Sequence, residues 1–129
     1  MTRPLRIAVA DDEPDVRDYF RRILPVLGHE VVVAAANGSE LVESCRQQRP
    51  DLIIADVRMP VMDGDEAVHE ICRDRPTPFI LVSAYSKNTA VPAGLGVGWA
   101  YLTKPIKRDD LEATISQLFV EIDGTEDAR

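Results

Sequence analysis

The chain has 129 residues, of which 45% are hydrophobic and 29% charged, and its formal net charge at pH 7 is −7. This length and composition are typical of one globular domain and exclude a disordered chain or two ordinary domains. The acidic balance argues against direct nucleic-acid binding, which needs a basic surface. No stretch is long and apolar enough for a membrane span or a signal peptide, so we expect a cytoplasmic protein without a membrane partner.

Five short apolar runs, at residues 5–10, 31–35, 52–56, 79–83 and 99–103, are predicted to be strands. They lack strict alternation, which is typical of strands covered on both faces by helices. Stretches with helical spacing lie between them, and their ends carry the usual start and stop signals: Pro14 and Gly28 around the first, Asn37-Gly38-Ser39 before the second, Gly64 before the third and Lys107 before the last. Pro25 should kink or end the first helix.

The fourth helix is predicted to be short or irregular. Pro92 and the glycines that follow it disfavour a helix, so at most residues 87–91 are helical. The alternation of strands and helices predicts an α/β fold with a doubly wound, five-stranded parallel sheet and five helices. We expect one domain over residues 1–122 and a polar, frayed tail over 123–129.

The cysteines Cys45 and Cys72 lie far apart and form no Cys-x-x-Cys or Cys/His cluster. We expect both to be reduced, buried and structural, which fits a cytoplasmic location.

Polar residues follow the predicted strands at one edge of the sheet, where ligands bind in doubly wound folds. Asp11 and Asp12 follow the first strand, Asp56 ends the third, Ser83 ends the fourth and Lys104 follows the fifth. Three carboxylates without nearby cysteine or histidine form an oxygen site that suits Mg²⁺ or Mn²⁺. Because a carboxylate can act as a nucleophile on phosphorus, the pattern also favours phosphoryl transfer.

Four motifs occur in order at these strand ends: Asp11-Asp12, "DVRMPVMDG" from Asp56, "SAYS" from Ser83 and "YLTKPI" from Tyr101. Together they resemble the receiver domain of two-component response regulators over residues 6–119. The resemblance implies a flavodoxin-like fold with strand order 2-1-3-4-5. It also implies a signalling switch whose only chemistry is its own phosphotransfer and autodephosphorylation, so the chain is not expected to be an enzyme.

The resemblance also implies roles for single residues. Asp56 would accept the phosphoryl group from a phosphohistidine of a sensor histidine kinase or histidine phosphotransferase. Asp12, Asp56 and the backbone carbonyl of Arg58 would hold Mg²⁺, and Asp11 would act through a metal-bound water. Lys104 would contact the phosphoryl group.

Ser83 would move to hydrogen-bond the phosphoryl group, and Tyr101 would turn inward as the switch residue. The Lys104-Pro105 bond is expected to be cis. The output partner or effector domain is not named by the sequence. Trp99, just before Tyr101, is either an anchor for a partner or a plug beside the weak fourth helix.

Arg58 and Tyr85 stand at the positions that tune phosphoryl lifetime in the family. Neither offers a carboxylate or an amide to orient a hydrolytic water, so we predict a long-lived phosphoryl group. His29 and His69 lie outside the motifs and are expected to have surface roles. The alternative functions are a phosphorylation-independent receiver-like interaction module and, less favoured by the motif order, a phosphatase with an aspartyl-phosphate.

Overall fold

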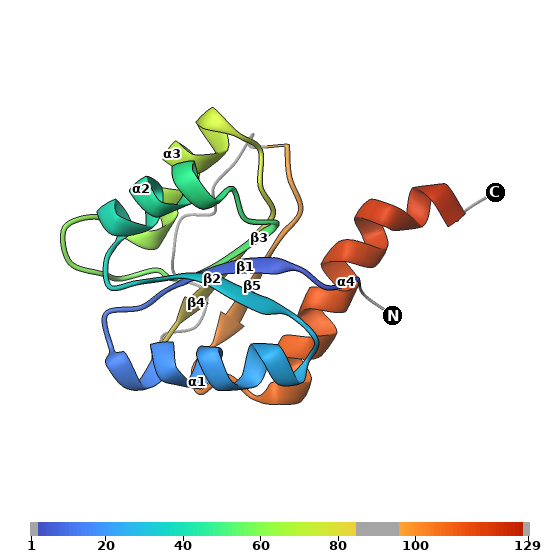
Figure 1. The fold of residues 1–129 in the computed structure, drawn as a ribbon, viewed down its shortest axis with the longest axis horizontal. Helices are drawn as coiled ribbons and strands as arrows, with labels where there is room; N and C mark the ends of the chain where they lie inside the picture. Colours follow the sequence, from blue (N-terminus) through green and yellow to red (C-terminus); the bar gives the residue numbers. More distant parts are fainter. Residues whose placement is uncertain (1–2, 85–95, 128–129) are drawn as a thin grey trace.

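The computed structural model describes residues 3–84 and 96–127, with side chains of the last helix described as far as Phe119. Its core is a five-stranded, all-parallel sheet in the order β2-β1-β3-β4-β5 (Figure 1). The strands are β1 (Arg6–Ala10), β2 (Glu30–Ala35), β3 (Leu52–Asp56), β4 (Phe79–Ser83) and β5 (Trp99–Thr103). The predicted sheet and its strand order are confirmed.

Four helices occur in the described residues: α1 (Pro14–Val26), α2 (Gly38–Gln48), α3 (Gly64–Asp74) and α4 (Arg108–Asp127). α2 and α3 cover one face of the sheet, and α1 and α4 cover the other (Figure 1). The short helix predicted at 87–91 lies outside the described residues, so α4 corresponds to the fifth predicted helix. Its backbone stays helical through Asp127, where the sequence predicted a frayed tail from residue 123. No helix in the described part of the chain is long and apolar enough to cross a membrane.

Two separate hydrophobic clusters fill the two sides of the sheet, because neighbouring side chains of a strand point to opposite faces. The residues of β1 and β3 that face α2 and α3 are Ala8, Ala10, Ile53 and Ala55. Those that face α1 and α4 are Ile7, Val9, Leu52 and Ile54. All eight are fully buried, which explains why the strands read as continuous apolar runs. Cys45 and Cys72 lie in the first cluster, buried and unpaired as predicted.

The ends of α1 follow their sequence signals. Pro14 stands in the first turn, where its missing N–H costs nothing, and Pro25 lies one residue before the helix ends at Val26. Gly28 has a φ of +94°, and its N–H donates to the carbonyl of Pro25 while the N–H of His29 donates to that of Leu24. These two bonds form a Schellman motif, in which glycine is the favoured residue at this position.

Two glycines allow helices to approach the loop that follows β3. A Cβ atom on Gly64 would lie against the backbone carbonyl of Asp56, and one on Gly38 would lie against that of Met62. The N-termini of α3 and α2 are therefore packed directly against this loop.

The prediction of a surface role for His29 is wrong. Its side chain is buried, with 9% exposed, and its Nδ1 accepts a hydrogen bond from the backbone N–H of Leu5 at 3.1 Å. The parallel pairing of β1 with β2 causes this, since it places the residues that precede the two strands side by side. Burial lowers the pKa of His29, and the negative charge of Glu112 opposes that shift. His69, on α3, is exposed as predicted.

Candidate functional site

Three acidic side chains meet at the carboxyl ends of β1 and β3. Asp11, Asp12 and Asp56 each offer a carboxylate oxygen, and these oxygens lie within 4.8 Å of one another. Asp11 and Asp56 are buried, whereas Asp12 is exposed. The sheet explains the gathering: β1 and β3 are adjacent and parallel, so both strands end at the same edge.

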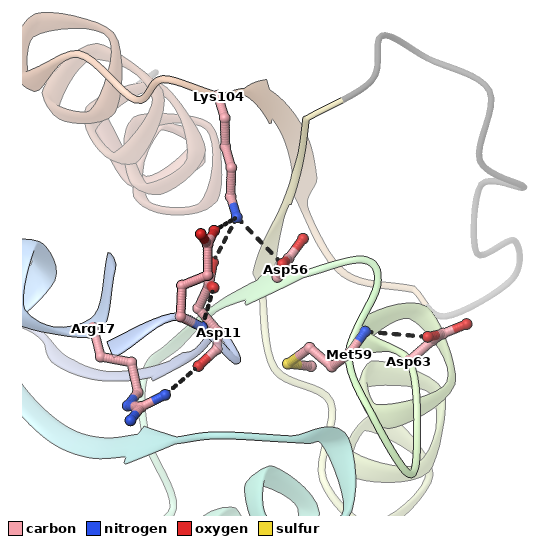
Figure 2. Close-up of polar contacts among 7 residues, drawn as sticks. Asp11, Arg17, Asp56, Met59, Asp63 and Lys104 are labelled. Atoms are coloured by element: carbon pink, nitrogen blue, oxygen red, sulfur yellow. Dashed lines mark hydrogen bonds and ion pairs between the residues drawn. The ribbon is translucent and has the colours of Figure 1, made fainter. Parts of the chain in front are cut away.

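Lys104 reaches into this cluster from the end of β5 (Figure 2). Its Nζ lies 2.9 Å from Asp11 Oδ2, 3.3 Å from Asp56 Oδ2 and 3.4 Å from Glu13 Oε1. The Lys104 backbone N–H donates to the carbonyl of Ser83 at 2.8 Å, which fixes the start of the side chain. The Lys104-Pro105 peptide bond is cis, as predicted.

The Asp11 side chain is held by its own loop. Its Oδ1 accepts from the N–H of Glu13 at 2.9 Å, and the Arg17 guanidinium donates to the Asp11 backbone carbonyl at 2.7 Å (Figure 2). Because α1 begins at Pro14, Arg17 lies in the first turn of the helix and points back to the site. These contacts orient the Asp11 carboxylate toward Asp56 and Lys104.

The loop between β3 and α3 is closed by its own polar contacts. The N–H of Gly64 donates to the carbonyl of Val57 at 2.8 Å, and the N–H of Met59 donates to Asp63 Oδ1 at 3.2 Å (Figure 2). The N–H of Asp63 donates in turn to Glu66 Oε1. These hydrogen bonds hold the loop that follows Asp56 in a tight turn beside the site. The Asp63 carboxylate stabilises this turn by accepting the N–H of Met59.

The two central charges influence one another. Burial raises the pKa of Asp56, and so does the negative charge of Asp11, while Lys104 and a backbone hydrogen bond from Arg58 act against that rise. For Lys104, partial burial disfavours the ammonium, but its hydrogen bonds and charge interactions with Asp11 and Asp56 outweigh this and raise its pKa. The site thus concentrates negative charge that a single ammonium does not neutralise.

The remaining predicted site residues lie on the same and neighbouring elements. Ser83 is buried at the end of β4, one residue beyond Val82, which pairs with Asp56. Tyr101 lies in β5 opposite Leu81, and its ring packs edge-on against Trp99 at 5.7 Å. The side chain of Arg58 is exposed while its backbone faces Asp56. Tyr85 lies outside the described residues.

The donor set fits a divalent hard cation. The cluster offers carboxylate oxygens at short separation, the ligands that Mg²⁺ prefers. Two of the three carboxylates are buried, and a dication would offset their mutual repulsion.

Sequence reasoning assigned no role to Glu13, Arg17 or Asp63. Signals for two of them were present: Arg17 stands one helical turn after Glu13, and Asp63 precedes the glycine that begins α3. Arg17 and Asp63 bind backbone groups of the loops, and Glu13 binds the Lys104 ammonium, so all three contacts depend on the folded chain.

Comparisons with known proteins agree with this geometry. The family model of the response regulator receiver domain matches residues 7–116. The transcriptional regulatory protein PdtaR of Mycobacterium tuberculosis is 38% identical over 109 residues, which cover 84% of this chain and 53% of PdtaR. The chain therefore spans about half the length of this relative.

Solved structures show the same fold. The response regulator domain of Thermotoga maritima CheB superposes with a TM-score of 0.78 at 29% identity, covering 90% of this chain and 96% of that one. The CheX–CheY–BeF3–Mg complex from Borrelia burgdorferi gives a TM-score of 0.81 at 25% identity, covering 92% of this chain and 91% of that one. With the family model matching most of the sequence, the chain belongs to the response regulator receiver domain family.

Proposed function

We propose that this chain is a phosphorylation-dependent signalling switch that accepts a phosphoryl group on Asp56. The observation that carries the proposal is the placement of a buried carboxylate at the end of β3, with Lys104 Nζ at 3.3 Å and two further acids within 4.8 Å. The donor is a phosphohistidine of a sensor histidine kinase or of a histidine phosphotransferase, as the family membership supports.

In the transfer, a carboxylate oxygen of Asp56 forms a bond to phosphorus while the bond from phosphorus to the donor's imidazole nitrogen breaks. The leaving nitrogen keeps the electron pair of that bond and takes up a proton. Lys104, already 3.3 Å from Asp56, supplies positive charge to the oxygens of the arriving group. Positioning and charge neutralisation are most of what phosphoryl transfer requires.

We propose that Asp12, Asp56 and the backbone carbonyl of Arg58 hold Mg²⁺, with Asp11 acting through a water. Bound Mg²⁺ supplies charge neutralisation for the phosphoryl oxygens. Mn²⁺, which the residue types alone also allowed, has no further support. The CheX–CheY complex from Borrelia burgdorferi contains Mg²⁺, which favours the same ion here.

The phosphodonor is proposed to dock beside the site. An open cavity there is lined by Val16 and Tyr19 of α1 and by Pro105 and Ile106 after the cis bond. Lys104 also lines it, so a partner seated on this apolar surface has direct access to the charged site.

Output is proposed to pass from Ser83 to Tyr101 and the surface of β5. Ser83 lies on the strand next to Asp56, and Tyr101 lies on the strand beyond it. The partner that reads this surface, or an effector domain that carries it, is not identified. A cytoplasmic location and the division into a receiver domain over residues 1–122 and a polar tail over 123–129 remain predictions.

The test is intact-mass spectrometry after incubation with acetyl phosphate and Mg²⁺. We expect one added phosphoryl group on the native chain, none on Asp56→Asn, and none when the metal is chelated. Asp18→Asn is the matched control, since Asp18 is exposed on α1 and its carboxylate pairs only with Arg21 among the described residues. It should be phosphorylated like the native chain.

Absence of an adduct on the native chain, together with no response to beryllofluoride, would contradict the switch. That result would favour the phosphorylation-independent interaction module. A phosphoryl adduct that still forms on Asp56→Asn would mean that a residue other than Asp56 accepts the group.

A further inference from the structure

A second site lies at the opposite edge of the sheet from the acidic cluster. A cavity of about 220 Å³ opens between α2 and α3, next to the segments that lead into β3 and β4. Its apolar lining is formed by Val42, Cys45 and Ile71, which are all buried. Its polar lining is rich in guanidinium groups, from Arg46, Arg49 and Arg75, with Asp74 as the acid among them.

The guanidinium groups of this arginine-lined cavity differ in how far they are already paired. Arg46 is engaged: its Nε lies 2.9 Å from Asp74 Oδ2, and its Nη1 lies 3.9 Å from Glu43 Oε1. This ion pair joins α2 to α3 at the cavity, and it uses the charge of Asp74.

The other two guanidinium groups keep donors available. Arg75 Nη1 donates to the carbonyl of Pro50 at 2.8 Å, which leaves most of its five N–H donors unused and no acid paired with its charge in the described residues. The Arg49 guanidinium has no hydrogen bond or ion pair within the part of the chain that the structure describes. Arg75 and Cys45 both line the cavity, so the Arg75 side chain borders its apolar part.

The backbone at Arg49 supplies an independent observation. Arg49 caps α2 in the left-handed region, with a φ of 50°, where glycine or asparagine is the usual residue. An arginine here costs conformational free energy, and a side chain beyond Cβ is not needed for the cap. The chain therefore carries local backbone strain at Arg49, a residue that also lines the cavity.

We propose that this arginine-lined cavity binds a small organic monocarboxylate with a compact, ring-sized apolar group. A cavity of about 150 Å³ in another protein holds benzene, so 220 Å³ accommodates a ring with its carboxylate. The guanidinium fork matches a carboxylate in two parallel hydrogen bonds. A single negative charge fits better than a phosphate dianion because Asp74 lies in the lining and Glu43 lies beside Arg46.

The test is a titration of the native chain with sodium benzoate, followed by backbone amide NMR shifts of residues 42–49, 71–75 and 77. Benzyl alcohol and acetate are the comparison probes, since each keeps only one half of the proposed ligand. We expect saturable shifts with benzoate and affinity at least about tenfold weaker for either partial probe.

Two variants and one control test which arginine binds the carboxylate of benzoate. Arg49→Gln should weaken benzoate binding about fivefold or more, because it removes a guanidinium that makes no hydrogen bond or ion pair in the described residues. Arg75→Gln should weaken it as well, but that side chain also holds the Pro50 carbonyl, so Arg49→Gln is the decisive variant. Arg73→Gln is the matched control on α3, since Arg73 is 76% exposed and does not line the cavity.

Equal binding of benzoate and benzyl alcohol would overturn the proposal in favour of an unspecific apolar cavity. Equal losses of benzoate affinity in Arg49→Gln and Arg73→Gln would mean that benzoate is attracted by the general positive charge and not by this cavity. The absence of a saturable shift would reject the site. The Asp56→Asn variant should bind benzoate like the native chain, so this result is independent of the phosphorylation proposal.

Discussion

The Lys104 ammonium lies among the carboxylates of Asp11, Glu13 and Asp56. It neutralises part of the negative charge that a divalent cation would also neutralise. A bound Mg²⁺ would therefore share the Asp56 carboxylate with Lys104 and lie within the same group of acids when no phosphoryl group is present. Replacing Lys104 by methionine should strengthen Mg²⁺ binding severalfold, or by about 1 kcal/mol, because one positive charge is removed. The same variant should be phosphorylated more slowly, since the phosphoryl oxygens lose a partner.

Isothermal titration with Mg²⁺ and the rate of the mass shift with acetyl phosphate measure these two effects. Lys107→Met is the matched control, since Lys107 is exposed just before α4. Weaker Mg²⁺ binding in Lys104→Met would mean that the lysine organises the carboxylates more than it competes with the metal.

His29 makes folding sensitive to pH. Its Nδ1 accepts the N–H of Leu5, which requires the neutral ring, and burial lowers its pKa below the ordinary value of about 6.5. Between the lowered value and about 6.5 the unfolded chain binds more protons than the folded one. The stabilisation is therefore present above this window and is lost as the pH falls through it, with a slope of at most about 1.4 kcal/mol per pH unit.

Urea unfolding of the native chain and of His29→Gln at pH values from 7.5 to 5 tests this dependence. His29→Gln should lower stability at pH 7.5 and flatten the decline toward pH 5. His69→Gln, which changes the exposed histidine of α3, should leave the decline as it is. Parallel pH curves for all three proteins would exclude His29 as the source.

At the scale of elements, the N-terminus of α3 packs directly against the end of the strand that carries Asp56. A Cβ on Gly64 would overlap the Asp56 carbonyl, so Gly64→Ala has to push α3 away from the end of β3. We expect a loss of about 2 kcal/mol in the free energy of unfolding and weaker Mg²⁺ binding. Gly28→Ala is the contrast: nothing lies within 4 Å of the added carbon, but the φ of +94° strains any side chain.

Gly28→Ala should therefore cost about 1 kcal/mol of stability and leave Mg²⁺ affinity unchanged. Chemical unfolding and calorimetric Mg²⁺ titration of both variants give the comparison. If Gly64→Ala binds Mg²⁺ like the native chain, the helix and the site are not coupled through this contact.

The elements themselves were largely predictable, because the three central strands are buried on both faces and each helix has a polar start. Residues 52–56, 79–83 and 99–103 agree with the observed strands to the residue. The observed β2 begins one residue earlier than predicted, at Glu30, and the observed β1 begins one residue later, at Arg6. Both differences arise because Arg6 and Glu30 form the first pair between the two strands. The extension of α4 to Asp127 was missed, because the polar residues after Ile122 carry no apolar stripe to signal a helix.

The candidate site was predictable where it depends on strand ends. Asp11, Asp12, Asp56 and Lys104 come together because parallel strands deliver their carboxyl ends to one edge. The burial of His29 and the hydrogen bond from Arg17 to the Asp11 carbonyl were not predicted. His29 could have been found by aligning the residues that precede adjacent parallel strands, whereas Arg17 depends on the direction in which a long side chain turns.

At the scale of the whole molecule, the aromatic side chains of β4 and β5 form a connected group that runs from the start of these two strands to the middle of β5. Trp99 stacks on Phe79, with ring centres 6.2 Å apart, and meets the edge of Tyr101 at 5.7 Å. It is partly buried against the cluster that lies under α2 and α3, which favours its structural role over an exposed anchor. Trp99 is the only tryptophan in the sequence, so its fluorescence reports on this one place.

If phosphorylation of Asp56 moves Tyr101, the environment of Trp99 has to change, because the two rings touch. We expect acetyl phosphate with Mg²⁺ to change Trp99 fluorescence in the native chain and not in Asp56→Asn. Tyr101→Leu should still gain the phosphoryl mass but lose most of the fluorescence change, whereas Tyr101→Phe, which keeps the ring, should retain it. A full change in phosphorylated Tyr101→Leu would show that the signal reaches β5 by another route, since then the ring beside Trp99 does not transmit it.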